Sequence, residues 1–549
     1  MNAKEFGNLL KKKRMRQNIK QEQLAEGICT IATISEIEQG EVVLEKSIRD
    51  RLLERLGENS YDYENYVTAK EYEKWKAEFL LLDALDDENL KEAELKLQQY
   101  EKSYKGKMNR QFYLTMLLEL WKLKKDDKEE YGSVLEEAVK LTIPKIDTKS
   151  ITGLVLSVTE LNLVLEYITY KNPDNVKELY QELIQYIKQE KFDLESKALF
   201  CSKVCLYFCN YQWKLLKDCK DKIEAIALAE ELLEVATQGI ESVRNHEKLY
   251  FTWELLQMKQ QVLTFLLEEP LLLQRKERYQ KEQEQTENFF EVWDRLYEQY
   301  QVPKQTNLYT IFYRKREVYC INDVIRAKRK MFGLRLQDLT DICELKTIQR
   351  IEKKASKIQI GLAQQLFQRF DLSMEMQRAS VVTSSEEAIW LEKELRVTIN
   401  QKEYEKAKRL LDRLKEIISM KEIINKQYVE YMEVELAYEM NEIGREKFIE
   451  KAKNILEYTV PLKIALKPLG IIKFVNGRKQ REEKYFTNVE ITILYNIAQE
   501  LEVEEKEKYF AILQEYFEEL EKEVTISPIL GMYGLVMSAM ASHMGNRKQ

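Results

Sequence analysis

The chain has 549 residues, 33% of them charged, with a formal net charge of −7. Its 44% apolar content is enough to build packed cores and excludes wholesale disorder. The negative balance excludes a uniformly basic coat, although a local basic patch remains compatible with nucleic-acid binding.

Composition also indicates the fold class. The length predicts roughly three to four domains at ~150 residues each. Only 7 Pro and 16 Gly occur, and these residues punctuate strands and loops. We therefore expect an all-α protein with short connections.

Enzyme signatures are missing from the sequence. It contains no Gly-rich phosphate loop, no metal-ligand spacing and no nucleophile–base constellation, and it has only 2 His. We expect a protein without catalytic residues, metal or cofactor. Cys201, Cys205 and Cys209 share one helical face, but the outer two would lie ~12 Å apart along the axis, too far to ligate one ion. We expect them to be buried as small apolar residues.

The ends of the chain bear on its location. The N-terminus opens with charged residues and lacks an apolar signal core, so we expect a cytoplasmic protein with reduced thiols. The longest uncharged stretch, residues 525–546, is interrupted by Pro and Gly and predicts no membrane span.

The first sixty residues predict a bundle of short helices. The first helix ends in the basic run KKKRMR, and the second is QEQLAEGI. A break then leads into a third helix, for which Thr30 is the expected N-cap and Gly40 the expected stop. KSIRDRLLERLG predicts a fourth helix that closes the bundle.

This segment occurs twice. Lys13, Arg14 and Leu24 align with Lys328, Arg329 and Leu339 at a constant spacing. After Gly27, which has no counterpart, the spacing shortens by one residue, and the match continues through Ile37 and Glu38 against Ile351 and Glu352. Equal spacing over roughly ninety residues indicates an internal duplication.

The stretch IKQEQLAEGICTIATISEIEQG resembles the helix-turn-helix of lambda-repressor/Cro-like (Xre-type) domains. The residues in the family's characteristic places are Gln21, Leu24, Ala25, Ser35, Ile37, Glu38 and Gly40. The short turn with Gly-Ile-Cys is similar to that of the peptide-pheromone-responsive RRNPP regulators of low-GC Gram-positive bacteria. This resemblance implies a DNA-binding domain followed by a TPR-like helical-repeat domain.

In the fold so implied, the third helix enters the major groove. We expect its exposed residues to face base edges; they are Thr30, Ile31, Ala32, Thr33 and Glu36. Lys13 and Arg14 from the basic run are expected phosphate contacts, and Gln21 resembles the family's phosphate or base contact. The same basic run, taken alone, would indicate only a solvated face.

The second copy is more basic and departs further from the pattern. We expect Lys346, Thr347 and Arg350 to face DNA, with Arg329 among the cations around them. The departures are Arg335 at the usual Ser/Thr cap, Leu336 for Gln21, Thr340 for Ala25 and Lys354 for the stop glycine. They leave open a purely structural second copy. Two readers in one chain predict an internal pseudo-dimer on an imperfect palindrome, with an ordinary homodimer as the alternative.

The remaining segments show helix-period apolar patterning, typical of helix pairs stacked into a superhelix whose concave face binds an extended peptide. In SKVCLYFCNYQWKL the resemblance assigns to Asn210 the part of holding a peptide backbone, which an amide can do as donor and acceptor. Tyr207 is a weaker candidate. For Asn210 the alternative is helix packing or solvent exposure, and for Tyr207 it is ordinary core packing.

We therefore predict helix-turn-helix domains at 1–62 and 319–375, and TPR-like helical domains at 63–318 and 376–549. The expected function is a sequence-specific transcription regulator that binds double-stranded DNA and is controlled by a short signalling peptide. The alternative is a peptide-sensing scaffold that acts on a protein partner, with a structural second helix-turn-helix.

Overall fold

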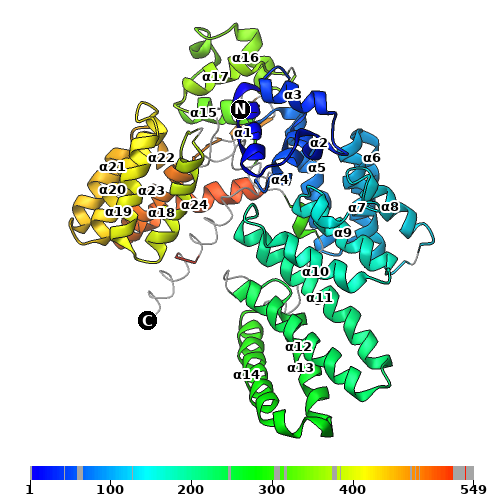
Figure 1. Ribbon diagram of the computed structural model, residues 1–549. Helices are drawn as coiled ribbons and strands as arrows, with labels where there is room; N and C mark the ends of the chain where they lie inside the picture. The colour runs from blue at the N-terminus through cyan, green and yellow to red at the C-terminus, as the bar shows by residue number, and fades with distance from the viewer. Residues whose placement is uncertain are drawn as a thin grey trace. The chain divides into compact units, whose positions relative to one another are not determined.

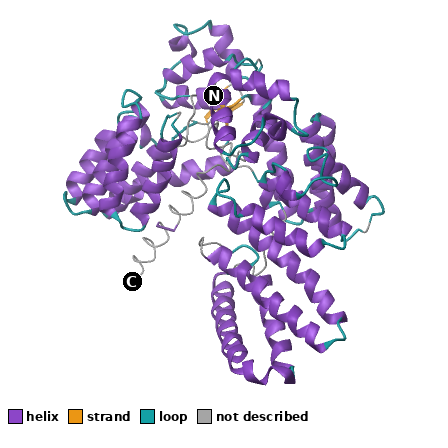
Figure 2. Cartoon of the chain, viewed as in Figure 1, coloured by secondary structure: helices purple, strands orange, loops and turns teal. Residues whose placement is uncertain are grey.

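The computed structural model describes most of the chain, in these ranges: 3–42, 44–58, 66–126, 128–244, 249–301, 310–314, 318–355, 357–373, 380–383, 385–469, 473–475, 478–480, 483–522 and 538–539. In the described ranges the protein is all-α, as predicted (Figure 2). The uncharged stretch at 525–546 lies outside the described residues except for 538–539.

Strands in the described part of the chain form two short pairs. β1 (Tyr66–Val67) pairs in parallel with β2 (Tyr319–Cys320), with Tyr66 opposite Tyr319. β3 (Lys473–Val475) pairs antiparallel with β4 (Arg478–Gln480). Neither pair is large enough to form a core.

The chain is organised as two compact units. The first unit comprises residues 7–58 and 81–314, and the second comprises residues 1–6, 59–80 and 315–549. Each unit contains a bundle of short helices and an array of longer ones. The four domain boundaries drawn from the sequence stay predictions.

Short helices make up the first bundle: α1 (Ala3–Arg16), α2 (Gln21–Ala25), α3 (Ile31–Gln39) and α4 (Lys46–Arg55). The predicted cap of α3 is confirmed, because the Thr30 hydroxyl accepts from the Thr33 amide at 3.1 Å. Gly40 ends the helix at φ 77°, a left-handed conformation that glycine adopts without strain. The core of the bundle includes Leu24, Ile34, Ile37 and Leu52.

The second bundle has a similar order of elements: α15 (Ile321–Met331), η5 (Leu336–Leu339), α16 (Leu345–Glu352) and α17 (Ile360–Gln368). Its second element is a 3-10 turn instead of an α-helix. Lys354, which stands in the place of Gly40, also adopts a positive φ, 56°. Its ammonium group pairs with Asp323 of α15 at 2.7 Å.

After α5 (Ala69–Asp86), the first array consists of longer helices: α6 (Leu90–Ser103), α7 (Lys107–Lys124), α8 (Tyr131–Lys140), α9 (Val158–Lys171), α10 (Val176–Ile187), α11 (Leu194–Asp218), α12 (Lys222–Arg244), α13 (Thr252–Glu268) and α14 (Lys276–Tyr300). Short 3-10 turns lie between or after them: η2 (Ile151–Gly153), η3 (Pro270–Arg275) and η4 (Ile311–Tyr313). Consecutive helices pack on one another, and α11 to α14 lie side by side in Figure 1.

Small residues on α12 let the neighbouring helices approach closely. A Cβ added at Gly239 would lie 2.8 Å from a Leu255 methyl of α13 and 2.9 Å from Cys205 Cβ of α11. Cys201, Cys205 and Cys209 are buried in this contact region, which confirms the predicted burial.

The second array is built from further helices: α18 (Glu386–Asn400), α19 (Tyr404–Ile417), α20 (Ile423–Glu439), α21 (Arg445–Leu456), α22 (Leu462–Ala465), α23 (Asn488–Glu500) and α24 (Val503–Lys522). α20 packs on α19 and α21, and it also meets α23. Contacts between neighbours and next neighbours are typical of stacked helix pairs.

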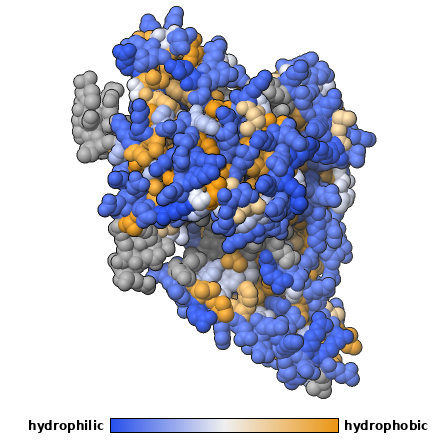
Figure 3. Space-filling view, turned by 90° about the vertical axis from the view of Figure 1, so that its left-hand side faces the viewer, coloured by the Kyte–Doolittle hydropathy of each residue, from blue (hydrophilic) through white to orange (hydrophobic). Residues whose placement is uncertain are grey.

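Hydrophilic residues cover most of the face shown in Figure 3, in keeping with the high charged content. Within the described ranges, none of the helices combines the length and apolarity needed to cross a membrane.

Candidate DNA interface and its junction with the helical array

α3 turns the residues expected to face DNA away from the bundle core. Ile31 is 50% exposed, whereas Ile34 and Ile37 on the opposite side are fully buried. The other exposed and half-exposed residues in and just before α3 include Thr30, Ala32, Thr33 and Glu36. The Thr30 and Thr33 hydroxyls lie 2.8 Å apart and bond to each other. The outer face of α3 therefore offers apolar, hydroxyl and carboxylate groups, all of which can contact base edges.

Arg14, which the sequence predicts as a phosphate contact, bonds to residues of its own bundle in the structure. Its guanidinium donates to both carboxylate oxygens of Glu38, at 2.6 and 2.9 Å, and to the Ile19 carbonyl at 2.8 Å. Its side chain is only 12% exposed. A buried carboxylate needs such a bidentate cation, so Arg14 joins α1 to α3 instead of reaching outward. Gln21 completes this centre, since its amide donates to Glu38 at 2.9 Å.

Arg329 has the same kind of partners in the second bundle. It donates to Glu352 at 2.6 and 2.8 Å and to the Leu334 carbonyl at 2.7 Å. Lys13 is also engaged, because its ammonium group pairs with Glu58 at 2.6 Å and ties α1 to the residues that follow α4. These three cations serve the fold of their own bundles.

Other cations of the second bundle point to its helical array. Arg326 and Lys330 both bond to Glu483, at 2.8 and 2.7 Å. On α16, Lys346 and Arg350 are exposed and Thr347 is half-exposed. The basic residues near α16 therefore divide into a group that holds the unit together and a group on the surface. Sequence patterns do not reveal this division, because Glu483 lies far away along the chain.

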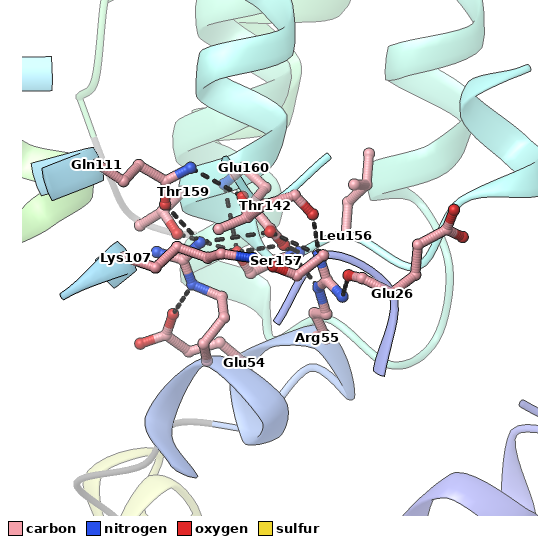
Figure 4. Close-up of polar contacts among 12 residues, drawn as sticks. Glu26, Glu54, Arg55, Lys107, Gln111, Thr142, Leu156, Ser157, Thr159 and Glu160 are labelled. Carbon is pink, nitrogen blue, oxygen red and sulfur yellow. Dashed lines mark hydrogen bonds and ion pairs between the residues drawn. The ribbon is translucent and has the colours of Figure 1, made fainter. Parts of the chain in front are cut away.

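Arg55 links the first bundle to the first array at a buried centre (Figure 4). Its guanidinium donates to both oxygens of Glu160, at 3.0 and 2.8 Å. It also donates to backbone carbonyls on both sides of the junction, namely those of Leu24, Glu26 and Thr142. Because Arg55 is only 2% exposed, these bonds replace its hydration.

Glu160 also forms the capping box at the start of α9 with Ser157, in which it is the third residue of the helix. It accepts from the backbone amide of Ser157 at 3.0 Å, and the Ser157 hydroxyl accepts from the Glu160 amide. Burial alone would raise the pKa of Glu160, but the charges of Arg55 and Arg51 outweigh it and lower the pKa to about 2. The start of α9 thus depends on a carboxylate that a helix of the bundle neutralises.

The helical array also holds the turn between α2 and α3. Glu26 pairs with Lys145 and Lys149, both at 2.9 Å. Gly27 has a φ of 75°, and a Cβ there would lie only 2.0 Å from the Thr142 carbonyl oxygen. The backbone of the turn before the candidate recognition helix therefore packs directly against the backbone of the helical array at Thr142. The residue that permits this approach is the glycine that the second copy lacks.

A comparable centre lies in the second unit. Gln427 donates to the Thr459 hydroxyl at 2.9 Å, as Gln111 donates to Thr142 at 2.8 Å in the first. Thr459 donates to Glu490, the capping-box acid of α23. The cation differs: Lys328 of α15 lies 3.4 Å from Glu490, and both side chains are fully buried.

In the first unit the cation that pairs with the capping-box acid, Arg55, comes from α4, the fourth helix of the bundle. In the second unit the cation is Lys328 of α15, the first helix of the bundle. Arg369, which aligns with Arg55, is exposed. Sequence reasoning missed both pairings. The available signals were the capping boxes Ser157-x-x-Glu160 and Thr487-x-x-Glu490 before apolar runs.

The two residues expected to bind a peptide lie on one side of α11. Tyr207 donates its hydroxyl to Glu166 of α9 at 2.7 Å, and Lys203 pairs with the same carboxylate at 3.1 Å. Burial raises the pKa of Glu166, but Lys122 and Lys203 outweigh it and hold the pKa well below the ordinary value. Asn210, seven residues after Lys203, is exposed. The structure thus brings Tyr207 into a polar cluster and leaves the Asn210 amide at the surface.

Comparisons with known proteins give few matches. No family model matches the chain, and no curated protein does. Among solved structures, the chain is similar to Bacillus thuringiensis PlcR in complex with the peptide PapR7 and DNA, with a TM-score of 0.30 and 16% identity over 55% of this chain and 99% of that one. It is also similar to the apo form of the competence regulator ComR from Streptococcus vestibularis, with a TM-score of 0.24 and 17% identity over 52% of this chain and 98% of that one.

Proposed function

We propose that the protein is a transcription regulator that reads double-stranded DNA with α3 and α16, one helix from each bundle. The observation that carries this proposal is the outer face of α3. Ile31 on this face is 50% exposed, and Thr30 caps the helix beside it. Ile34 and Ile37 on the opposite face are fully buried in the core, so the core does not need Ile31. A helix of this kind, preceded by a short turn and a second helix, suits insertion into the major groove.

The second reader is supported by the surface cations of α16. Lys346 and Arg350 project from the helix, and the described residues provide no ion pair for either. Arginine suits bidentate bonds to guanine, and lysine suits guanine or phosphate. The side chains of α3 and α16 differ at equivalent positions, so the two half-sites of the operator are expected to differ.

Control by a signalling peptide is the second part of the proposal. The cluster of Tyr207, Lys203 and Glu166, with Asn210 beside it, combines donors and acceptors suited to a peptide backbone. The cluster lies on α9 and α11, and Glu160 belongs to the capping box at the start of α9. A peptide that shifts α9 would act on the Arg55–Glu160 pair and so on the position of the first reader.

The test of DNA reading is selection of a sequence from random duplexes by the full chain, followed by fluorescence anisotropy over a range of KCl. A selected site that binds at least about 10³-fold more tightly than random duplex is the expected result. Lys346→Ala with Arg350→Ala should reduce the salt slope by about 2. Lys451→Ala, an exposed lysine on α21, is the control and should leave the slope unchanged. Equal affinity for all duplexes would refute DNA reading.

Peptide control is tested with a heptapeptide selected from a random library for binding to the full chain. Its addition should change the affinity for the selected site, and Asn210→Ala should abolish that change. Asn288→Ala on α14 offers a matched exposed amide and should preserve the response. An unaltered response in Asn210→Ala removes Asn210 from the proposed peptide site.

A second candidate function rests on a specific observation. Arg326, Lys328, Arg329 and Lys330 are all occupied by carboxylates of their own unit. This favours a structural second bundle in a scaffold that senses a peptide and acts on a protein partner. Loss of the effect of the Lys346 and Arg350 substitutions on the salt slope would favour this alternative.

A further inference from the structure

The connection between α6 and α7 carries three lysines, and we call residues 102–107 the α6–α7 corner. Lys102 lies in the last turn of α6, Lys105 lies between the helices, and Lys107 is the first residue of α7. All three residues are exposed. Lys105 donates to the backbone carbonyl of Glu101, and no carboxylate of the described chain forms an ion pair with any of the three. The corner therefore presents three positive charges that the described residues do not neutralise.

The space beside the corner is open. A Cβ added at Gly106 would meet no heavy atom within 4 Å. Gly106 precedes Lys107 and is the N-cap of α7. A partner can therefore approach the backbone of the corner as well as its lysine side chains.

The corner lies next to the start of the candidate recognition helix. The Lys107 ammonium group donates to the Gly27 carbonyl at 2.7 Å, and Figure 4 shows Lys107 at the junction of the bundle with the array. Gly27 is three residues before Thr30, the N-cap of α3, and three residues span at most ~11 Å. The Lys107 ammonium group is therefore about one width of a DNA major groove, ~12 Å, or less from the end of α3 that meets base edges.

The acid of the turn between α2 and α3 is already neutralised by the array. Glu26 pairs with both Lys145 and Lys149 at 2.9 Å, and these lysines are 47% and 33% exposed. Because two cations share one carboxylate, the array leaves an excess of positive charge on this side of the turn as well. An anionic partner is favoured beside the turn, since its one carboxylate does not stand free to repel it.

The second unit lacks this charge at the equivalent connection. The residues between α19 and α20 include Lys421 and Glu422, whose charges cancel, and α20 begins with Ile423 where α7 begins with Lys107. Lysines at the corner are thus a feature of the first unit and are not required for stacking two helices of this repeat.

We propose that the α6–α7 corner binds phosphates of the DNA strand that borders the half-site read by α3, so that the helical array is itself part of the DNA interface. This inference rests on the proposed reading of DNA by α3. An ammonium group has three N–H donors, and Lys107 uses one of them on Gly27, which leaves two for phosphate oxygens. Contacts of this kind fix the position of the protein on the duplex and carry no base preference.

The test is the salt dependence of binding to the selected site, measured by fluorescence anisotropy with the full chain. Lys102→Ala, Lys105→Ala and Lys107→Ala combined should lower the salt slope by about 2 to 3, as expected for three lost phosphate contacts. Binding to random duplex should weaken by a similar factor, so the base preference of the selected site should not change. The double variant with Lys102→Ala and Lys105→Ala keeps the bond to Gly27 and should lower the slope by about 2.

A matched control removes three exposed lysines at the far end of α11, namely Lys214, Lys217 and Lys220. α11 has 25 residues, and its start lies near Arg55, whose backbone carbonyl accepts from Lys191. The far end is therefore roughly 37 Å away along the helix axis. This control should leave the slope unchanged, and circular dichroism should show native helix content in every variant.

The outcomes separate the corner from the reader. An unchanged slope in the double and triple variants, with the site still selected, overturns the corner and leaves reading by α3 intact. An equal loss in the α11 control also overturns it, because the effect would then be unspecific attraction. A changed base preference in the corner variants contradicts a pure phosphate contact. Failure of the wild type to select any site overturns DNA reading and the corner with it.

Discussion

Arg55 and Glu160, 105 residues apart in the sequence, form a bidentate ion pair in which both side chains are almost completely buried. Arg55 is the last residue of α4 in the first bundle, and Glu160 belongs to the capping box at the start of α9. The pair therefore couples the position of the candidate reader to the start of a helix in the candidate sensor.

Replacing Arg55 should destabilise the first unit strongly. Arg55→Met removes the bidentate partner of the buried Glu160 carboxylate and leaves only Arg51, at 3.3 Å, to compensate it. The loss should approach that of a broken buried pair, about 3–5 kcal/mol. Urea unfolding followed by circular dichroism measures this loss. Arg55→Lys keeps the charge but not the fork of donors, so its loss should be smaller. A loss below about 1 kcal/mol for Arg55→Met would contradict the structural importance of the pair.

Gly27 should tolerate no side chain, because the Thr142 carbonyl would lie 2.0 Å from a Cβ. Gly333 provides a matched control: its φ is 68°, close to the 75° of Gly27, and no heavy atom of the described chain lies within 4 Å of the place that its Cβ would take. Both alanine variants carry the left-handed strain, about 1–2 kcal/mol. Gly27→Ala should cost about 1–3 kcal/mol more, as overpacking does. Equal unfolding free energies for the two variants would argue against the close approach.

Stability should fall in acid partly through Glu160. Its pKa is lowered from 4.5 in the unfolded chain to about 2, so the unfolded state binds the proton first as pH falls. The stabilisation is complete above about pH 6 and decreases by about 2 kcal/mol at pH 3. The difference in unfolding free energy between the wild type and Glu160→Gln should narrow by this amount. A difference that is constant from pH 6 to pH 3 would show that Glu160 does not titrate as described.

The ion pair between Arg14 and Glu38 predicts that Arg14 contributes to stability more than to DNA binding. Arg14→Lys loses one of two bonds to Glu38 and should cost about 1–3 kcal/mol of stability, with little effect on the salt slope of DNA binding. Lys11→Ala, a change at an exposed lysine of the same helix, should lower the slope by about 1 and leave stability within about 0.5 kcal/mol. A lowered salt slope with unchanged stability in Arg14→Lys would instead support Arg14 as a phosphate contact.

Local features of the sequence were enough to predict the elements of the first bundle. The cap at Thr30, the stop at Gly40 and the inward positions of Ile34 and Ile37 depend on residues a few positions apart. The same is true of the all-α fold class, since it follows from composition and helical period. The α-helix expected in the second copy formed as the 3-10 turn η5 instead, where Leu336 and Thr340 replace Gln21 and Ala25.

Long-range pairing explains what the sequence could not predict. Five of the six residues at 11–16 are basic, yet Lys13 and Arg14 pair with Glu58 and Glu38 while Lys11 is exposed. Only the fold brings these acids near. The sequence could not predict the partner of Tyr207 either, because the acid that accepts from its hydroxyl, Glu166, comes from another helix.

The proposal that one chain carries two DNA readers predicts the mass of the complex between the full chain and its selected operator. Sedimentation velocity at concentrations just above saturation measures this mass. We expect one chain per operator, with both α3 and α16 protected from modification. Two chains per operator, with α16 unprotected, would contradict the claim and would make the second bundle a structural part of an ordinary dimer.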